Sequence, residues 1–330
     1  MKIRTKEQQI IVDFWAAVAM GHKQKKQVIH AEGYRAEMHI PYIPDFNEDH
    51  MLNLYYPNTA SDRTLGTGDG KPVSDQTSAE KLPTVINIHG GGWMFSHLDD
   101  SHEFMADIAS RGFAVMGMGY RLLPGNDLRG IVQDIFCSLH WLERFGPMRG
   151  FDLSRVLLTG DSAGGHLALL TACIQESPKL QEIYGVEPVD FRITTIGISC
   201  PCPDTDHLFI VPSREADASK MSMAYKELLL GEQGEEAPNK DAMSFGETIE
   251  YVNDIGKFPP VFLIGSENEN LYYQTETLLS QFEEKGIRYE AKIWKKEEGP
   301  HLMHVFNVEH WDWYESRITN DRMLKYFMDC

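Results

Sequence analysis

Short apolar runs alternate along the chain with longer stretches in which apolar residues recur at helical spacing. The runs rich in β-branched and aromatic residues predict strands at residues 84–89, 114–118, 156–160, 193–199, 261–265 and 289–294. The stretches with a period of about 3.6 residues predict helices that include residues 101–110, 131–144, 165–175 and 273–285. Such alternation is typical of β-α-β units. We therefore expect an α/β fold with a mostly parallel central sheet and helices on both faces.

An amphipathic helix is predicted near the N-terminus, over residues 10–20. This run is short and is broken by Asp13, and no small-residue cleavage site follows it, so it is neither a signal peptide nor a membrane span. One side of the helix carries Ile10, Ile11, Phe14, Trp15 and Val18. Packing against the core and covering a pocket are both open to it.

Two further segments interrupt the alternation. Residues 58–82 are polar and rich in Gly, Ser and Thr, which predicts a solvated connection between two strands. Residues 201–253 contain a predicted helix at 222–230 and an acidic turn, so they form a candidate lid. We predict a single domain over residues 1–330, with a small cap from about residues 1–50 and from the insertion at about residues 201–253.

The charge balance argues against nucleic acid as a partner. The chain has 31 Lys and Arg against 49 Asp and Glu, a formal net charge of −18. Nucleic-acid binding draws its affinity from basic side chains that release counterions. The acidic residues are spread along the sequence, which indicates solubility and identifies no substrate.

The cysteines indicate a reducing compartment. Five of them are present, at Cys137, Cys173, Cys200, Cys202 and Cys330, without a paired CxxC spacing. An odd number without that spacing predicts neither a disulfide framework nor a zinc ribbon. Free thiols favour a cytoplasmic location, and no stretch of the sequence is long enough to span a bilayer.

A candidate nucleophile lies in the sequence RVLLTGDSAGGHLALLTACI, where an apolar strand, a glycine-flanked Ser162 and an apolar helix follow one another. A serine hydroxyl is a weak nucleophile unless a sharp turn presents it to a base. Gly160 and Gly164 remove side chains that such a turn would bring into collision. The helix start places partial positive charge beside Ser162, and the amide of Ala163 is a candidate donor to an oxyanion. A tight structural turn is the alternative interpretation.

A second glycine-rich turn ends the strand in TVINIHGGGW. Consecutive glycines let the backbone approach a ligand and aim several N–H groups at one oxygen, so Gly91 and Gly92 are the candidate oxyanion donors. His89 is expected to stabilise the loop. A phosphate-binding loop is disfavoured, because neither GK[ST] nor GxGxxG spacing is present.

The motifs HGGGW at 89–93, YRLLP at 120–124 and GDSAGG at 160–165 together resemble the hormone-sensitive-lipase-like family of esterases. The likeness covers roughly residues 82–304. It implies an α/β-hydrolase core, a cap built partly from the N-terminal segment, and hydrolysis of short or medium acyl esters without a cofactor. The chain departs from many members in that no acidic residue directly follows YRLLP.

The family order of Ser, then acid, then His directs the search for the acid to the segment PPVFLIGSENENL. The family places a carboxylate two residues before a leucine, and here that position is Glu269, where most members have Asp. Glutamate can orient an imidazole equally well in principle. Glu267 is the competitor and Asn268 a displaced acid position, so the choice stays open with Glu269 preferred.

The candidate base lies in WKKEEGPHLMHVFNV. His304 matches the family's histidine site, and His301 is its competitor. Read as HxxH, the two histidines suggest metal ligands, but no further His or Cys at metal spacing accompanies them, so we predict no metal.

These residues predict a serine carboxylesterase. Ser162 would attack an ester carbonyl, with His304 as base and Glu269 orienting it, while Gly91, Gly92 and Ala163 stabilise the oxyanion. The expected partner is a small-molecule ester, and a homo-oligomer is open. Candidate substrate contacts are Trp93 beyond the glycines and Phe14 and Trp15 of the cap, although such aromatic residues are more often core.

Two rival functions remain. A serine peptidase would use the same triad, although nothing resembling a peptide-sorting domain accompanies the core. A non-catalytic small-molecule binder on the same fold would be expected to lack a triad member, whereas candidates for all three are present.

Overall fold

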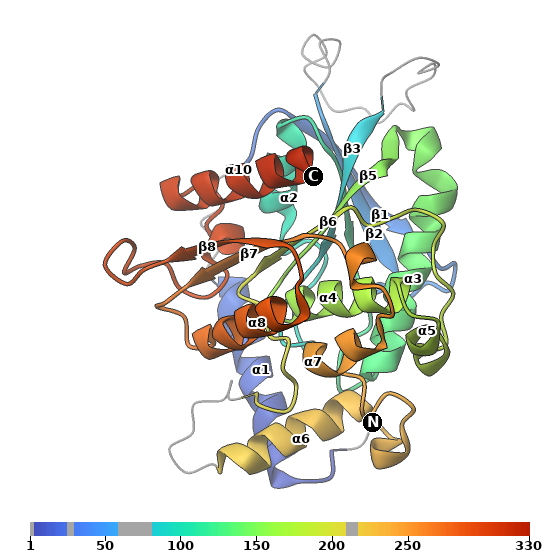
Figure 1. Cartoon of the computed structure of the whole chain (residues 1–330), viewed down its shortest axis with the longest axis vertical. Helices are drawn as coiled ribbons and strands as arrows, with labels where there is room; N and C mark the ends of the chain where they lie inside the picture. Colours follow the sequence, from blue (N-terminus) through green and yellow to red (C-terminus); the bar gives the residue numbers. More distant parts are fainter. Residues whose placement is uncertain (1–2, 25–29, 59–80, 209–216) are drawn as a thin grey trace.

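The computed structural model describes residues 3–24, 30–58, 81–208 and 217–330. An eight-stranded sheet of order β1-β2-β4-β3-β5-β6-β7-β8 forms its centre (Figure 1). The strands are β1 (Tyr34–Pro41), β2 (Met51–Pro57), β3 (Leu82–Ile88), β4 (Ala114–Met118), β5 (Phe151–Asp161), β6 (Thr195–Ser199), β7 (Val261–Ser266) and β8 (Tyr289–Trp294). Only β2 runs antiparallel to its neighbours, and β3 to β8 are parallel.

Helices cover the sheet on both faces. The α-helices are α1 (Lys6–Gln24), α2 (His102–Ser110), α3 (Leu128–Phe145), α4 (Ala163–Gln175), α5 (Pro178–Tyr184), α6 (Ala218–Leu230), α7 (Phe245–Thr248), α8 (Tyr272–Lys285), α9 (Phe306–Glu309) and α10 (Tyr314–Asp329). Short 3-10 turns are η2 (Pro147–Arg149), η3 (Gly234–Glu236), η4 (Ile249–Tyr251) and η5 (Ile255–Lys257).

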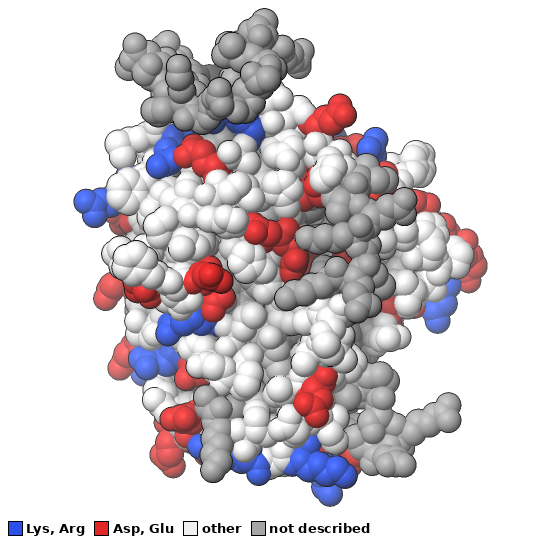
Figure 2. All heavy atoms as spheres, turned by 180° about the vertical axis from the view of Figure 1, so that it is seen from behind, with Lys and Arg blue, Asp and Glu red and all other residues white. Residues whose placement is uncertain are grey.

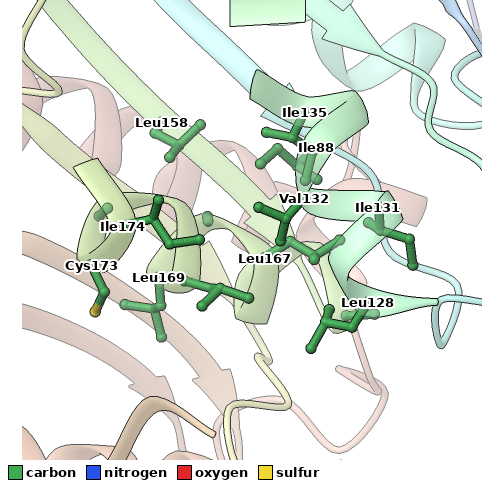
Figure 3. Close-up of a cluster of buried hydrophobic side chains, with 14 of the residues drawn as sticks. Ile88, Leu128, Ile131, Val132, Ile135, Leu158, Leu167, Leu169, Cys173 and Ile174 are labelled. Atoms are coloured by element: carbon green, nitrogen blue, oxygen red, sulfur yellow. The ribbon is translucent and has the colours of Figure 1, made fainter. Parts of the chain in front are cut away.

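Alternation along the buried strands builds two hydrophobic clusters. Within β5, Val156 and Leu158 face one cluster while Leu157 faces the other, as the two-residue period of a strand requires. The larger cluster packs the strands against α3 and α4, and the smaller one packs them against α2, α9 and α10. Figure 3 shows the larger cluster, in which Ile88 of β3 and Leu158 of β5 lie among side chains of α3 and α4: Leu128, Ile131, Val132, Ile135, Leu167, Leu169, Cys173 and Ile174.

Helices α1 and α6 pack against each other at one end of the molecule, beyond α4 and α7 (Figure 1). The apolar side of α1 faces inward as its spacing indicates, with Ile11 and Trp15 buried. Gln8 of α1 also donates from Nε2 to Glu227 Oε2 of α6 at 2.8 Å. Two segments far apart in sequence therefore form one layer at this end of the molecule, and its role as a cap stays a prediction.

The fold prediction is confirmed in its central part. Each predicted strand and helix has a counterpart, and the sheet is mostly parallel. The N-terminal boundary differs, because residues 34–41, expected in the cap, form the edge strand β1 paired with β2. Of the polar connection predicted at 58–82, residues 59–80 lie outside the described part of the chain.

Charged side chains are distributed over the surface. On the face shown in Figure 2, Asp and Glu lie among Lys, Arg and uncharged residues without gathering in one patch.

In the described part of the chain, no helix has both the length and the apolar character needed to cross a bilayer.

Candidate active site

Ser162 occupies the sharp turn between β5 and α4. Its φ of 52° and ψ of −118° lie outside the regions that non-glycine residues ordinarily adopt, so the backbone is strained there. The close approach explains both flanking glycines: a Cβ on Gly160 would lie 2.3 Å from the Gly164 oxygen, and one on Gly164 would lie 2.1 Å from the Ile88 oxygen. The Ser162 amide donates to the Ser199 oxygen at 2.9 Å, which anchors the turn to β6.

The structure brings Ser162, His304 and Glu269 together in one line. Ser162 Oγ lies 2.9 Å from His304 Nε2, and His304 Nδ1 lies 2.5 Å from Glu269 Oε2. A carboxylate only accepts, so Nδ1 carries the proton of the neutral ring and Nε2 accepts from the serine hydroxyl. Glu269 lies between β7 and α8 and His304 between β8 and α9, both after the carboxyl ends of parallel strands, where α/β folds place their sites.

The surroundings of His304 raise its pKa above the ordinary value for histidine. Burial by itself disfavours the charged ring, but the hydrogen bond and the negative charge of Glu269 outweigh it and raise the pKa of His304. The Glu269 side chain is fully buried, whereas the His304 side chain is 34% exposed. The arrangement can therefore accept a proton from Ser162 and hold it beside a fixed negative charge.

The alternative candidates Glu267, Asn268 and His301 have other partners than Ser162. Glu267 pairs with Lys295 Nζ at 2.6 Å at the surface, and Asn268 donates from Nδ2 to the Gly299 oxygen at 2.8 Å. His301 packs edge-on against Trp313, with its centroid 4.9 Å away. None of these side chains is hydrogen-bonded to Ser162 or His304 within the described residues, so of the competing candidates the structure places Glu269 and His304 beside Ser162.

The carbonyls of the glycine loop are held by hydrogen bonds from nearby side chains and amides. The Gly90 oxygen accepts from His89 Nδ1 at 2.8 Å and from the Tyr120 hydroxyl at 3.3 Å. A trans peptide directs its N–H opposite to its carbonyl, so the Gly91 N–H points away from these partners. His89 thus stabilises the loop, as its position in the sequence predicts, and its burial lowers its pKa to about 4.

The next peptide is fixed in the same way. The Gly91 oxygen accepts from the amides of Met94 and Phe95, each at 3.0 Å, which directs the Gly92 N–H to the opposite side. Gly91 and Gly92 have φ of 102° and 58°, conformations that glycine adopts at little cost. Ala163 is the first residue of α4, where the amide has no partner within the helix and the helix dipole adds positive charge.

The three aromatic residues predicted to contact substrate differ in exposure. Trp93 is fully buried, with its ring edge-on to His166 and Tyr225, so it supports the glycine loop instead of facing a ligand. Trp15 is buried directly over Gly92, where a Cβ would lie 2.1 Å from its indole. Phe14 is half-buried beside Trp15, with ring centroids 5.3 Å apart.

Comparisons with known proteins decide the family. The family model described as BD-FAE matches residues 73–281, more than half of the chain. The chain belongs to the BD-FAE family. It is also similar over its full extent to esterase B from Lactobacillus rhamnosis (HN001), with 40% identity, a TM-score of 0.83 and coverage of 98% of this chain and 95% of esterase B. The predicted hormone-sensitive-lipase-like esterase family and α/β-hydrolase fold are thereby confirmed.

Other relatives of this BD-FAE chain match over a shorter region. Lipase 2 from Moraxella sp. (strain TA144) is 33% identical over 122 residues, 34% of this chain and 28% of the lipase. Carboxylesterase NlhH from Mycobacterium tuberculosis is 34% identical over 116 residues, 34% of each protein. The chain thus spans about a third of the length of the curated relatives it matches.

One further acid supports the candidate site. It is Asp161, which is part of the GDSAGG motif but for which the sequence predicts no role. Asp161 precedes Ser162 and accepts the Gly90 amide at 3.2 Å. Burial raises the pKa of Asp161 to about 6, although His304 nearby opposes the shift. Asp161 therefore joins the turn at Ser162 to the glycine loop.

A second supporting acid lies on α3. Asp134 accepts from Nη2 and Nε of Arg121, at 2.7 and 2.9 Å, and from the Arg121 amide at 3.0 Å. The segment after Arg121 returns to the glycine loop, since the Leu123 amide donates to the Trp93 oxygen at 2.8 Å. Asp134, in the second turn of α3, is thus the acid that holds the YRLLP segment, a contact that no local spacing indicates.

Two buried thiols lie beside Ser162, Glu269 and His304. Cys202 Sγ is 3.6 Å from Ser162 Oγ. In the described ranges, Cys200, Glu269 and His304 form a group whose ligand atoms all lie within 4.8 Å of one another, a spacing that can hold a metal ion. Two of these side chains, Glu269 and His304, are already hydrogen-bonded to each other, and His304 is also hydrogen-bonded to Ser162.

Proposed function

We propose that this protein is a serine carboxylic-ester hydrolase that acts through an acyl-enzyme on short or medium acyl esters of small molecules. One observation carries the proposal: Ser162 Oγ is 2.9 Å from His304 Nε2, and His304 Nδ1 is 2.5 Å from Glu269. Such a line of hydroxyl, imidazole and buried carboxylate is what nucleophilic acyl transfer requires.

In the proposed acylation, Ser162 Oγ attacks the ester carbonyl carbon while its proton moves to His304 Nε2. The negative charge of Glu269 stabilises the imidazolium that forms. The tetrahedral oxyanion accepts hydrogen bonds from the amides of Gly91, Gly92 and Ala163. When the intermediate collapses, the carbon–oxygen bond to the alcohol breaks and His304 returns the proton to the departing oxygen.

Deacylation repeats the sequence with water. His304 takes a proton from a water molecule, the hydroxide oxygen bonds to the acyl carbon, and Ser162 leaves with the proton that His304 returns. Deacylation releases a carboxylic acid and regenerates the Ser162 hydroxyl. With the alcohol released during acylation, the overall reaction consumes only ester and water.

The substrate class rests on related proteins and on the aromatic cap. A structure of esterase B, 39% identical with a TM-score of 0.83, holds a C4-C4 SN3 tributyrin phosphonate as inhibitor and covers 99% of this chain. Phe14 of α1 is half-buried beside Trp15, which itself lies over Gly92, and we propose that it limits the room for long acyl groups. We propose butyryl-sized acyl groups as the preferred range.

Purified protein and a series of p-nitrophenyl esters from acetate to palmitate test this function. We expect turnover that is greatest for short chains and that falls by about 10⁴-fold or more in Ser162→Ala, because the nucleophile is lost. Peptide p-nitroanilides serve as the comparison for a peptidase and should be cleaved far more slowly. Full activity in Ser162→Ala, or a preference for the anilides, would overturn the proposal.

The compartment and the cap are part of the same proposal. The five cysteines are all free, which supports a cytoplasmic location. The contact of α1 with α6 supports the division into an α/β-hydrolase domain and a small cap.

A further inference from the structure

The carbonyl of Gly92 receives its hydrogen bond from the cap instead of from the sheet. The Tyr225 hydroxyl of α6 donates to the Gly92 oxygen at 3.1 Å. Trp15 Nε1 of α1 donates in turn to the Tyr225 oxygen at 2.5 Å. One chain of hydrogen bonds therefore passes from α1 through α6 to the glycine loop.

Gly92 is a position where such a tether matters. The Gly90 and Gly91 carbonyls are held by partners from the loop itself and from Tyr120, whereas Tyr225 is the donor that holds the Gly92 carbonyl. The Gly92 oxygen belongs to the peptide that follows the two proposed donor peptides, so the Tyr225 bond fixes Gly92 on the side opposite its own N–H. Glycine changes φ and ψ at little conformational cost, so without this bond Gly92 and the donor peptide before it could shift. An oxyanion site is effective only when its donors are fixed before the reaction begins.

Ring packing reinforces the tether. The indole of Trp15 stacks on Phe95 with centroids 5.4 Å apart and an interplanar angle of 22°, and Tyr225 packs edge-on against Trp93 at 5.8 Å. Trp15 also lies so close to Gly92 that a Cβ there would be 2.1 Å from its ring. Trp15 therefore contacts the loop at Gly92 and Phe95, and Tyr225 contacts it at Gly92 and Trp93.

We propose that Trp15 and Tyr225 are positioning residues, which hold the oxyanion loop in its working conformation and make catalysis depend on α1 and α6 being seated. This inference rests on the proposed esterase function. Under this proposal Trp15 positions the glycine loop and is not a substrate contact. The helices α1 and α6 then contribute to the oxyanion site. Neither residue touches the reacting atoms; each acts through the backbone of Gly92.

Tyr225→Phe is the central variant, because it removes one hydroxyl and keeps the ring that packs on Trp93. The matched control is Tyr184→Phe, since the Tyr184 hydroxyl also donates to a backbone oxygen in the core, that of Ala242 at 2.6 Å, away from the glycine loop. Trp15→Phe is the second test variant, because it keeps an aromatic ring on Phe95 but loses the N–H that orients Tyr225.

Two readouts separate positioning from general loosening. The first is the split of kcat and KM for p-nitrophenyl butyrate. The second is the inhibition constant of an alkyl trifluoromethyl ketone, which forms an anionic adduct with the serine, compared with that of the methyl ketone of the same shape. We expect Tyr225→Phe to lower kcat about tenfold with little change in KM, the scale of one lost buried hydrogen bond.

The trifluoromethyl ketone should bind about tenfold more weakly to Tyr225→Phe, while the methyl ketone should bind both proteins equally. Trp15→Phe should move both readouts in the same direction, which keeps the test available if Tyr225→Phe does not fold. Wild-type kcat and ketone affinity in both variants, or an equal loss in Tyr184→Phe, would overturn the inference alone. A wild-type protein that hydrolyses no ester and forms no ketone adduct would instead overturn the proposed function, and this inference with it.

Discussion

At the scale of single residues, Glu269 and Glu267 show how differently two neighbouring carboxylates are used. Glu269 turns inward, where its side chain is fully buried against His304. Glu267 lies two residues earlier and turns outward to Lys295. The sequence gives no periodic signal that distinguishes the two, because both lie in the irregular loop that follows β7.

The first prediction concerns the identity of the triad acid. Glu269→Gln should lower kcat by about 10³- to 10⁴-fold, because the amide can hold His304 in the wrong tautomer and cannot stabilise the imidazolium. Glu267→Gln, the matched control, should keep kcat within about twofold, because only a surface ion pair is lost. Steady-state kinetics on p-nitrophenyl butyrate measure both. A larger loss in Glu267→Gln than in Glu269→Gln would reverse the assignment.

The second prediction follows from the raised pKa of His304. The ring acts as a base only when neutral, so a raised pKa moves the acid limb of the kcat/KM profile to higher pH. We expect kcat/KM to increase with pH through a midpoint above 6.5, the ordinary value for histidine. The residual activity of Glu269→Gln should show a lower midpoint, since the charge that favours the imidazolium is gone. A wild-type midpoint below 6.5 is incompatible with this electrostatic description.

At the scale of the elements, α3 stabilises the segment 120–124 through one buried acid. The Asp134 side chain is 2% exposed and binds both the guanidinium and the amide of Arg121. His50 from the loop before β2 also approaches Asp134, with Nε2 3.3 Å from Oδ1. Asp134 thus joins α3, the 120–124 segment and the start of β2.

The third prediction is a loss of stability in Asp134→Ala. The substitution leaves the Arg121 amide without its acceptor and removes a bidentate ion pair, so the free energy of unfolding should fall by about 3 kcal/mol. Urea denaturation monitored by tryptophan fluorescence measures it. Glu182→Ala is the control, because its pair with Lys179 is exposed and its loss should leave stability nearly unchanged. Equal effects of the two substitutions would show that the Asp134 network contributes little.

At the scale of the whole molecule, the pattern of apolar residues predicted the parallel strands and their helices, because buried strands and amphipathic helices leave periodic signals. It did not predict β1, which is partly exposed and lies at the sheet edge, where periodicity is weak, and it assigned no range to β2 or α10. The turn at Ser162 was predictable, since glycines mark it on both sides. The link from Tyr225 to Gly92 was not, because it joins residues 133 positions apart and depends on how the cap packs.

Central to the account is the activation of Ser162 by His304, and covalent labelling with a fluorophosphonate tests it most directly. The labelled protein would be digested and mapped by mass spectrometry, with Ser162→Ala and His304→Ala treated in parallel. We predict one adduct, on the peptide that contains Ser162, absent from Ser162→Ala and formed at least 100-fold more slowly in His304→Ala, because the hydroxyl then lacks its base. An adduct on another residue, or undiminished labelling of either variant, would contradict the account.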